Sequence, residues 1–241
     1  MKEKDSDKKV LYGRDSVKTA ILVDGGFYRK RAKLLFGNKT PKERAKELQD
    51  YCNCLLASKF ETRNLYRIFY YDCPPSDKNI YHPYTGKSVN LKKSDEYTWM
   101  NDFLSELTNL RKVALRMGRV SDDTAQYQLK YDVLKKLFQG KLKFEDIEED
   151  DFQPNIKQKG VDMRIGVDIS SLAFKKQVQQ IILIAGDSDF VPAAKQARRE
   201  GIDFILDPMQ SHINADLFEH IDGIQTASTR SKFVKQKSQS K

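Results

Sequence analysis

The sequence predicts an α/β fold in which helices cover both faces of a mostly parallel sheet, giving a three-layer sandwich. Short apolar runs alternate with stretches of helical spacing through most of the 241 residues. The runs are apolar at almost every position, for example TAILV at residues 19–23 and IILIA at residues 181–185, as in strands covered on both faces. The length suits one substantial domain better than two small ones.

The N-terminal half predicts three strands and three helices. A strand at 19–23 ends at the turn signal Asp24-Gly25-Gly26, and helical spacing follows to Leu35. Pro41, near the start of the next helical stretch, is typical of a first helical turn. The remaining segments are expected in this order: the rest of that helix to about Lys59, a strand at 65–72, a loop at 76–94, a helix at 95–110 and a strand at 113–120.

The C-terminal half predicts an insertion followed by regular alternation. Residues 121–158 are expected to be an insertion with one helix near 127–138 and the acidic run EDIEEDD. After it we expect a helix at 160–178, a strand at 181–185, a helix to Glu200, a strand at 202–206 and a helix at 215–221. The domain is therefore expected over residues 18–227, between a charged leader at 1–17 and a basic, disordered tail at 228–241.

Composition narrows the classes of partner and compartment. The formal net charge of +9 favours polyanionic partners, because phosphate contacts release counterions. No apolar run approaches the roughly 20 residues of a membrane helix, and the N-terminus lacks the apolar stretch of a signal peptide. Cys52, Cys54 and Cys73 match neither a disulfide framework nor a zinc site. These features predict a cytoplasmic protein without a membrane segment.

Aspartates follow the strands at the positions where such sheets bind ligands. Asp24 comes directly after the first strand, and Asp187 and Asp189 follow the strand IILIA within GDSDF. In a common doubly wound order these two strands are neighbours at the switch point, beyond whose carboxyl ends ligands bind. Asp162 lies in the first turn of a helix that opens at Lys159-Gly160. A close backbone turn at the glycine would place it at the same edge of the sheet.

Clustered carboxylates predict a divalent metal ion. They resist joint ionisation, so a neutralising cation is their natural partner. Oxygen ligands without His or Cys select hard ions such as Mg²⁺ or Mn²⁺. Such an ion polarises a phosphoryl oxygen and lowers the pKa of a bound water. In a basic protein this favours phosphodiester hydrolysis, with the same four residues as catalytic and metal-binding side chains: Asp24, Asp162, Asp187 and Asp189.

Helix capping is the structural alternative for each aspartate taken singly. An aspartate after a strand is commonly a helix N-cap or turn residue, and Asp189 could cap the helix that begins at Phe190. Four aspartates on one ligand-binding edge favour a site over four separate caps. Asp168 lies about 9 Å farther along the helix than Asp162. It keeps apolar spacing with its neighbours, which favours a supporting or buried polar role.

Three motifs in this order carry a resemblance to a known family. AILVDGGFY (20–28), KGVDMR (159–164) and IAGDSDFVP (184–192) resemble the NYN domain, particularly its LabA-like branch within the PIN-like nuclease superfamily. The resemblance covers about residues 18–227 and implies a Rossmann-like sheet and Mg²⁺- or Mn²⁺-dependent cleavage of RNA. The family's acidic positions fall on Asp24, Asp162, Asp187 and Asp189. Many relatives carry Asn where this chain has Phe27, and the insertion exceeds the family core.

Side chains around these aspartates are candidates for substrate binding. Ser188 lies between two of them and is suited to bind a phosphate or a metal-bound water, or to stabilise its own turn. Lys159 and Arg164 flank Asp162 and are suited to the RNA backbone, or to solvent alone. Tyr81, His82 and Tyr84 alternate with lysines, as in segments that stack bases. Packing of these rings on their own domain is the preferred interpretation.

Other functions compete with RNA cleavage. A haloacid-dehalogenase-type phosphatase needs a second Asp two residues after the first, where this chain has Gly26, and a Toprim-type site needs an early Glu in place of Asp24. Neither a dinucleotide-binding nor a P-loop glycine motif occurs. The rival from another class is a catalytically silent RNA-binding or scaffolding module. Retention of four aspartates favours the enzyme, and a homo-oligomer is compatible with either function.

Overall fold

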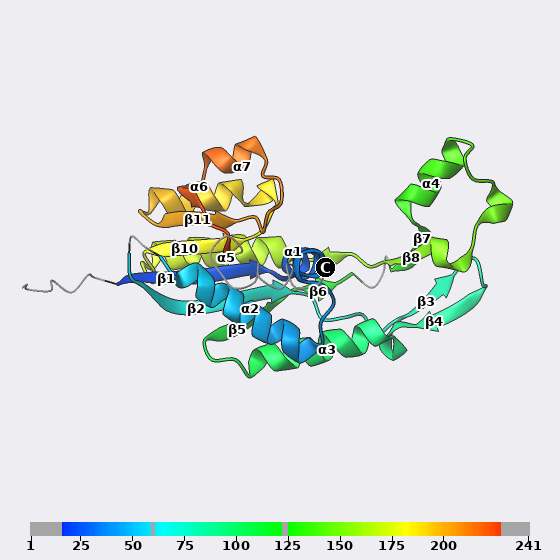
Figure 1. Cartoon of the computed structure of the whole chain (residues 1–241), viewed down its shortest axis with the longest axis horizontal. Coiled ribbons are helices and arrows are strands. Elements are labelled where there is room, and N and C mark those ends of the chain that lie inside the picture. The colour runs from blue at the N-terminus through cyan, green and yellow to red at the C-terminus, as the bar shows by residue number, and fades with distance from the viewer. Residues whose placement is uncertain (1–15, 59–60, 122–124, 228–241) are drawn as a thin grey trace, which may run out of the picture.

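The computed structural model describes residues 16–58, 61–121 and 125–227. Its centre is a six-stranded, wholly parallel sheet in the order β12-β11-β10-β1-β2-β5. The strands are β1 (Val17–Asp24), β2 (Arg63–Asp72), β5 (Val113–Met117), β10 (Gln180–Ile184), β11 (Asp203–Asp207) and β12 (Gly223–Ile224). Helices lie on both sides of the sheet (Figure 1). The predicted three-layer α/β sandwich is therefore confirmed.

Alternating side chains of the strands divide the core into two layers. Ala20 and Leu22 pack on one face with α5, α6 and α7, whereas Ile21 and Val23 pack on the other with α1, α2 and α3. The helices are α1 (Gly25–Phe36), α2 (Pro41–Leu56), α3 (Asp95–Thr108), α5 (Val161–Phe174), α6 (Val191–Arg199) and α7 (Ala215–Glu219). All five residues of β10 are buried, which explains why four of the five are apolar. The exception is Gln180, which hydrogen-bonds to Glu61 and Asp203.

The connections place the switch point between β1 and β10, as the sequence predicts. From β1 the chain moves to β2 and β5 on one side, then returns through α5 to β10, β11 and β12 on the other. Val23 of β1 is paired with Ile184 of β10 near the carboxyl ends of both strands. Residues that follow these two strands therefore share one edge of the sheet.

An arm projects from the carboxyl edge of the sheet (Figure 1). It consists of β3 (Asn79–His82), β4 (Lys87–Asn90), β7 (Gln126–Leu129), α4 (Tyr131–Phe138) and β8 (Phe152–Asn155). β3 pairs with β4 and β7 pairs with β8, both antiparallel. The arm has a small core of its own, in which the buried His82 ring lies 4.2 Å from Tyr127 and 5.2 Å from Phe152, centroid to centroid.

Several predicted boundaries are corrected by the structure. The expected loop at 76–94 contains the β3–β4 hairpin, because Ile80 and His82 alternate with exposed residues and are buried against the arm. The expected helix at 127–138 starts only at Tyr131, and the residues before it form β7. The strand expected at 113–120 is divided at Gly118 into β5 and β6 (Arg119–Val120), and β6 pairs outside the sheet with β9 (Gln158–Lys159).

The remaining predictions concern the two ends of the chain and membrane-spanning helices. The predicted leader at 1–17 lies almost wholly outside the described residues, and the predicted tail at 228–241 lies entirely outside them. Among the residues that the structure describes, no helix has both the length and the apolar character needed to cross a membrane.

A buried carboxyl group ties α2 to β11 beneath the helical layer. The Tyr51 hydroxyl donates to Asp207 at 2.7 Å, and the Met209 amide donates to the other carboxyl oxygen at 2.8 Å. Both Tyr51 and Asp207 are fully buried. Burial raises the pKa of Asp207 from 3.8 to about 6, against the opposing effect of its hydrogen bonds.

This pKa predicts a pH-dependent stability that Asp207→Asn removes. Folding raises the pKa of Asp207, so the protonated carboxyl group stabilises the folded state. This stabilisation is fully present below about pH 4. It is lost as the pH rises through 6. From pH 4 to 7 the wild type is expected to lose about 2 kcal/mol more than the variant. Urea unfolding across this range measures the difference, and parallel pH profiles for the two proteins would contradict the assignment.

Candidate active site

Four of the six parallel strands end at or near an aspartate. Asp24, Asp72 and Asp207 are the last residues of β1, β2 and β11, and Asp187 lies three residues beyond the end of β10. All four therefore lie at the carboxyl edge of the sheet. They differ in environment, and this difference separates a structural aspartate from a candidate for chemistry.

Asp24 caps a helix and also lies among other carboxylates. Its Oδ1 accepts a hydrogen bond from the Phe27 amide at 3.1 Å, so it is the N-cap of α1. Burial raises its pKa from 3.8 to about 6, with the charges of Asp162 and Asp72 contributing to the rise and the hydrogen bond from the Phe27 amide opposing it. Asp24 therefore caps α1 and is also a member of the carboxylate cluster.

Asp162 reaches the same edge from the first turn of α5. Gly160 is the N-cap residue with φ 80° and ψ 9°, a left-handed conformation that glycine adopts without a steric penalty. The Asp162 side chain is exposed. Partial burial, then the charges of Asp187 and Asp189, raise its pKa. The close backbone turn that the sequence predicts at Gly160 is confirmed.

Asp187 and Asp189 belong to a single turn of 3₁₀ helix, η5 (Ser188–Phe190). The Asp189 amide donates to Asp187 Oδ1 at 3.1 Å, so the capping residue of this turn is Asp187. The alternative that Asp189 caps a helix starting at Phe190 is wrong, because α6 begins at Val191 without a side-chain cap. Asp189 is exposed, and its carboxylate accepts no hydrogen bond from the described residues.

Electrostatic interactions thus link the four predicted aspartates through Asp162. Asp24 interacts with Asp162, and Asp162 interacts with both Asp187 and Asp189. Within the described residues, no three Asp, Glu, His or Cys side chains are arranged closely enough to hold one ion. The donor chemistry fits a hard divalent cation, but the carboxylates are not closed into a ligand shell.

Phe27 packs against the backbone of Gly186, beside the aspartates. A Cβ atom at Gly186 would lie 2.5 Å from Phe27 Cε2, so residue 186 has no room for a side chain. Gly186 directly precedes Asp187, and Phe27 directly follows the Gly25-Gly26 pair. The ring therefore fixes the two strand ends relative to each other. Many proteins with the NYN domain that the sequence resembles carry a polar Asn at this position.

Asp72 also lies at the carboxyl edge of the sheet, and the sequence analysis did not select it. It is fully buried and forms a two-pronged ion pair with Arg29, with Nε to Oδ2 at 3.0 Å and Nη2 to Oδ1 at 3.1 Å. The Tyr70 hydroxyl, the Cys73 amide and the Gln158 side chain also donate to it. The strand LYRIFYYD ends at this aspartate. The rule that identified Asp24 therefore also selects Asp72.

Asp168 has the supporting role that its spacing predicts. Its Oδ2 accepts a hydrogen bond from the Tyr71 hydroxyl at 2.9 Å and pairs with Arg116 Nε at 3.0 Å. Tyr71 is buried in β2. These contacts hold α5 against the sheet and leave Asp168 outside the carboxylate cluster.

The predicted substrate-binding residues lie around the cluster. Ser188 is half-buried within η5, Lys159 is exposed on β9, and Arg164 is exposed in the first turn of α5. Neither Lys159 nor Arg164 forms an ion pair with any described residue. Of the aromatic candidates, His82 is buried against Phe152, as the preferred interpretation expects. Tyr84 lies 6.0 Å from Phe152 but is 54% exposed, and Tyr81 is 63% exposed.

The family model of the NYN domain matches residues 48–222, more than half of the chain. The chain belongs to the NYN domain family. This family is part of the PIN-like nuclease superfamily. The matched range contains Asp162, Asp187 and Asp189, whereas Asp24 lies before it and joins the cluster through the pairing of β1 with β10.

Comparison with individual proteins adds little to the family assignment. No curated protein matches the chain. A crystal structure of a protein of unknown function from Vibrio parahaemolyticus is similar, with a TM-score of 0.43 and 12% sequence identity. The match covers 87% of this chain and 91% of that one.

The two glycines after Asp24 predict losses of stability of different size on substitution. A Cβ at Gly25 would lie 2.5 Å from Asp72 Oδ2 and 2.6 Å from the Tyr70 hydroxyl, whereas a Cβ at Gly26 would meet nothing closer than 3.6 Å. Gly25→Ala is therefore expected to lower the free energy of unfolding by about 1–3 kcal/mol, and Gly26→Ala by less than about 0.5 kcal/mol. Chemical denaturation of both variants tests this, and equal stabilities would show that the Asp72 pocket yields easily.

Proposed function

We propose that this NYN domain is a ribonuclease that depends on Mg²⁺ or Mn²⁺ and belongs to the LabA-like branch of the family. The observation that supports it best is the convergence of four aspartates from β1, α5 and η5 at the carboxyl edge beside the switch point. A protein that only binds RNA gains nothing from an acidic cluster that repels phosphates. A metal-dependent hydrolase requires one.

Asp24, Asp162, Asp187 and Asp189 are the side chains that would hold the ion. Burial and mutual repulsion raise the pKa values of Asp24 and Asp162, so a cation stabilises their ionised forms. When bound, the ion supplies Lewis acidity toward a phosphoryl oxygen and a more acidic water. The protein side chains position it: Phe27 packing and the capping bonds of Asp24 and Asp187 hold the backbone from which the carboxylates project.

Cations beside the cluster would bind the RNA backbone. Lys159 and Arg164 flank Asp162 on β9 and α5, and both are exposed. Ser188, between Asp187 and Asp189, would donate to a phosphate oxygen. The folded domain is proposed to extend over residues 18–227, with 121–158 as an insertion. A cytoplasmic location and a homo-oligomer stay predictions from the sequence.

The silent RNA-binding module stays the second candidate for one specific reason. No three potential ligand side chains are closed around a common point within the described residues. For catalysis the ion would have to draw the carboxylates together. For a silent module they would stay apart, and Mn²⁺ would bind weakly or not at all.

Cleavage of labelled RNA tests the nuclease directly. Single-stranded and structured RNA are incubated with Mn²⁺, Mg²⁺ or EDTA. Wild type is expected to cleave only with metal, and Asp24→Asn and Asp187→Asn are expected to lower the rate by about 100-fold or more, because each removes a charged metal ligand. Asp203→Asn is the matched control, since Asp203 lies at the amino end of β11 away from the cluster. Cleavage that survives both site substitutions would sink the assignment of the site.

Binding of Mn²⁺ distinguishes the two candidates without relying on turnover. Calorimetric titration of the wild type is expected to show a site that Asp187→Asn weakens by about 10-fold or more, because one anionic ligand is lost. Asp203→Asn is expected to bind like the wild type. RNA binding without any Mn²⁺ binding would favour the silent module.

A further inference from the structure

A second feature lies next to the carboxylate cluster: a basic cavity between α1, the loop that follows it, and α3. Its volume is about 600 Å³, within the range of small-ligand sites. Gly26 and Arg29 form the wall nearest the aspartates, because Gly26 lies beside Asp24 Oδ1 and Arg29 pairs with Asp72. The lining residues are Gly26, Arg29, Lys30, Lys33, Asn38, Lys39, Arg44, Glu96 and Trp99.

The cations of this cavity outnumber the acids around it. Arg29 is paired with Asp72, and Lys39 and Arg44 share the single carboxylate of Glu47. The exposed Lys30 and Lys33, one turn apart on α1, form no ion pair with any residue that the structure describes. The only acid in the lining is Glu96. Five cations therefore face three carboxylates, which leaves an excess of about two positive charges for a ligand.

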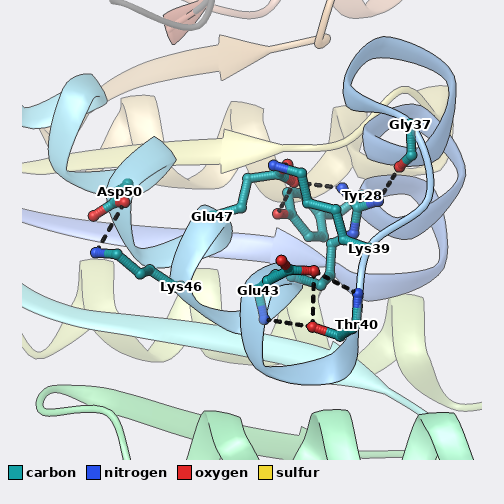
Figure 2. Close-up of polar contacts among 9 residues, drawn as sticks. Tyr28, Gly37, Lys39, Thr40, Glu43, Lys46, Glu47 and Asp50 are labelled. Carbon is teal, nitrogen blue, oxygen red and sulfur yellow. Dashed lines mark hydrogen bonds and ion pairs between the residues drawn. The ribbon is translucent and has the colours of Figure 1, made fainter.

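Arg44, which lines the cavity, belongs to a buried polar network around Glu47 (Figure 2). Glu47 is buried and accepts a hydrogen bond from the Tyr28 hydroxyl at 3.0 Å and another from Arg44. Arg44, also buried, donates to the Gly37 carbonyl and so fixes the loop between α1 and α2. This loop carries Asn38 and Lys39 into the cavity.

Lys39 retains capacity for a ligand. Its Nζ lies 2.7 Å from Glu47 Oε2, yet that oxygen accepts no hydrogen bond of good geometry, so the contact is an ion pair alone. An ammonium group has three donors, and its side chain is 27% exposed. The adjoining Trp99 donates from Nε1 to the Lys39 carbonyl at 3.0 Å, which places an aromatic wall beside the cations.

We propose that this cavity binds phosphate of the RNA strand that enters the aspartate cluster, an inference that rests on the proposed ribonuclease function. The charge excess matches two phosphodiester groups or one terminal phosphate monoester, which carries close to two negative charges at neutral pH. Gly26 joins the cavity to Asp24, so a strand whose phosphate occupies the cavity continues over the glycine toward the carboxylates. The aromatic wall of Trp99 suits the sugar or base of the same nucleotide.

Binding of RNA in EDTA tests the cavity independently of cleavage. Single-stranded RNA labelled at its 3′ end, with either a 5′-phosphate or a 5′-hydroxyl, is titrated by fluorescence anisotropy at several salt concentrations. Lys30→Gln/Lys33→Gln is expected to raise the Kd about 5- to 10-fold and to reduce the salt dependence of log K by about 1–2. If the variant loses affinity only for 5′-phosphorylated RNA, the cavity binds a terminal phosphate. If it loses affinity equally for both RNAs, the cavity binds internal phosphates.

The control removes the same charge elsewhere. Lys195 and Arg199 are exposed on α6, on the opposite face of the sheet. Lys195→Gln/Arg199→Gln is expected to change the Kd less than 2-fold, and thermal unfolding checks that both double variants are folded. Wild-type affinity in the cavity variant, or equal weakening in the control, would overturn the proposal. Cleavage by the wild type separates the two proposals. If the wild type shows no metal-dependent cleavage but the cavity variant still binds RNA more weakly, only the nuclease is rejected.

Discussion

The ion pair between Arg29 and Asp72 is the contact on which the architecture of this edge depends. A buried charge pair is tolerated only when its remaining hydrogen-bonding capacity is satisfied, and here Tyr70, Cys73 and Gln158 all donate to the carboxylate. The pair joins α1 to β2, leaves no room for a side chain at Gly25, and draws the last residues of the insertion to the sheet. It therefore sets where α1 starts, and with it the position of Asp24.

The sheet and the aspartate cluster could be predicted because local and global signals agree. Strands buried on both faces must be apolar throughout, as TAILV and IILIA are, and parallel strands at a switch point must align their carboxyl ends. Asp24 and Asp187 follow from these two facts alone. Asp162 follows from a glycine whose positive φ sends the chain across the same edge. Each of these positions is determined by backbone constraints that are visible within a few residues.

The rest depends on partners that are distant in sequence. Asp72 ends a strand like Asp24 does, but its burial depends on Arg29, which is 43 residues away. Arg44 lies in a helix whose sequence is typical of a solvated surface, yet it is buried because Glu47, Tyr28 and the Gly37 carbonyl surround its charge. The arm escaped prediction for a similar reason: its strands are four residues long and bury His82 only against Tyr127 and Phe152.

The placement of opposite charges on one edge has a physical consequence for substrate choice. An acidic cluster alone repels a polyanion, and the net charge of +9 is spread over the whole chain. The excess cations of α1 line a cavity whose wall includes Gly26, and Gly26 lies beside Asp24. Under the proposed function, attraction and repulsion would therefore act on neighbouring phosphates of one strand. A ligand with several phosphates in series can satisfy both regions once a cation neutralises the aspartates, whereas a single small phosphate cannot. The geometry therefore favours a nucleic acid strand over a phosphorylated metabolite.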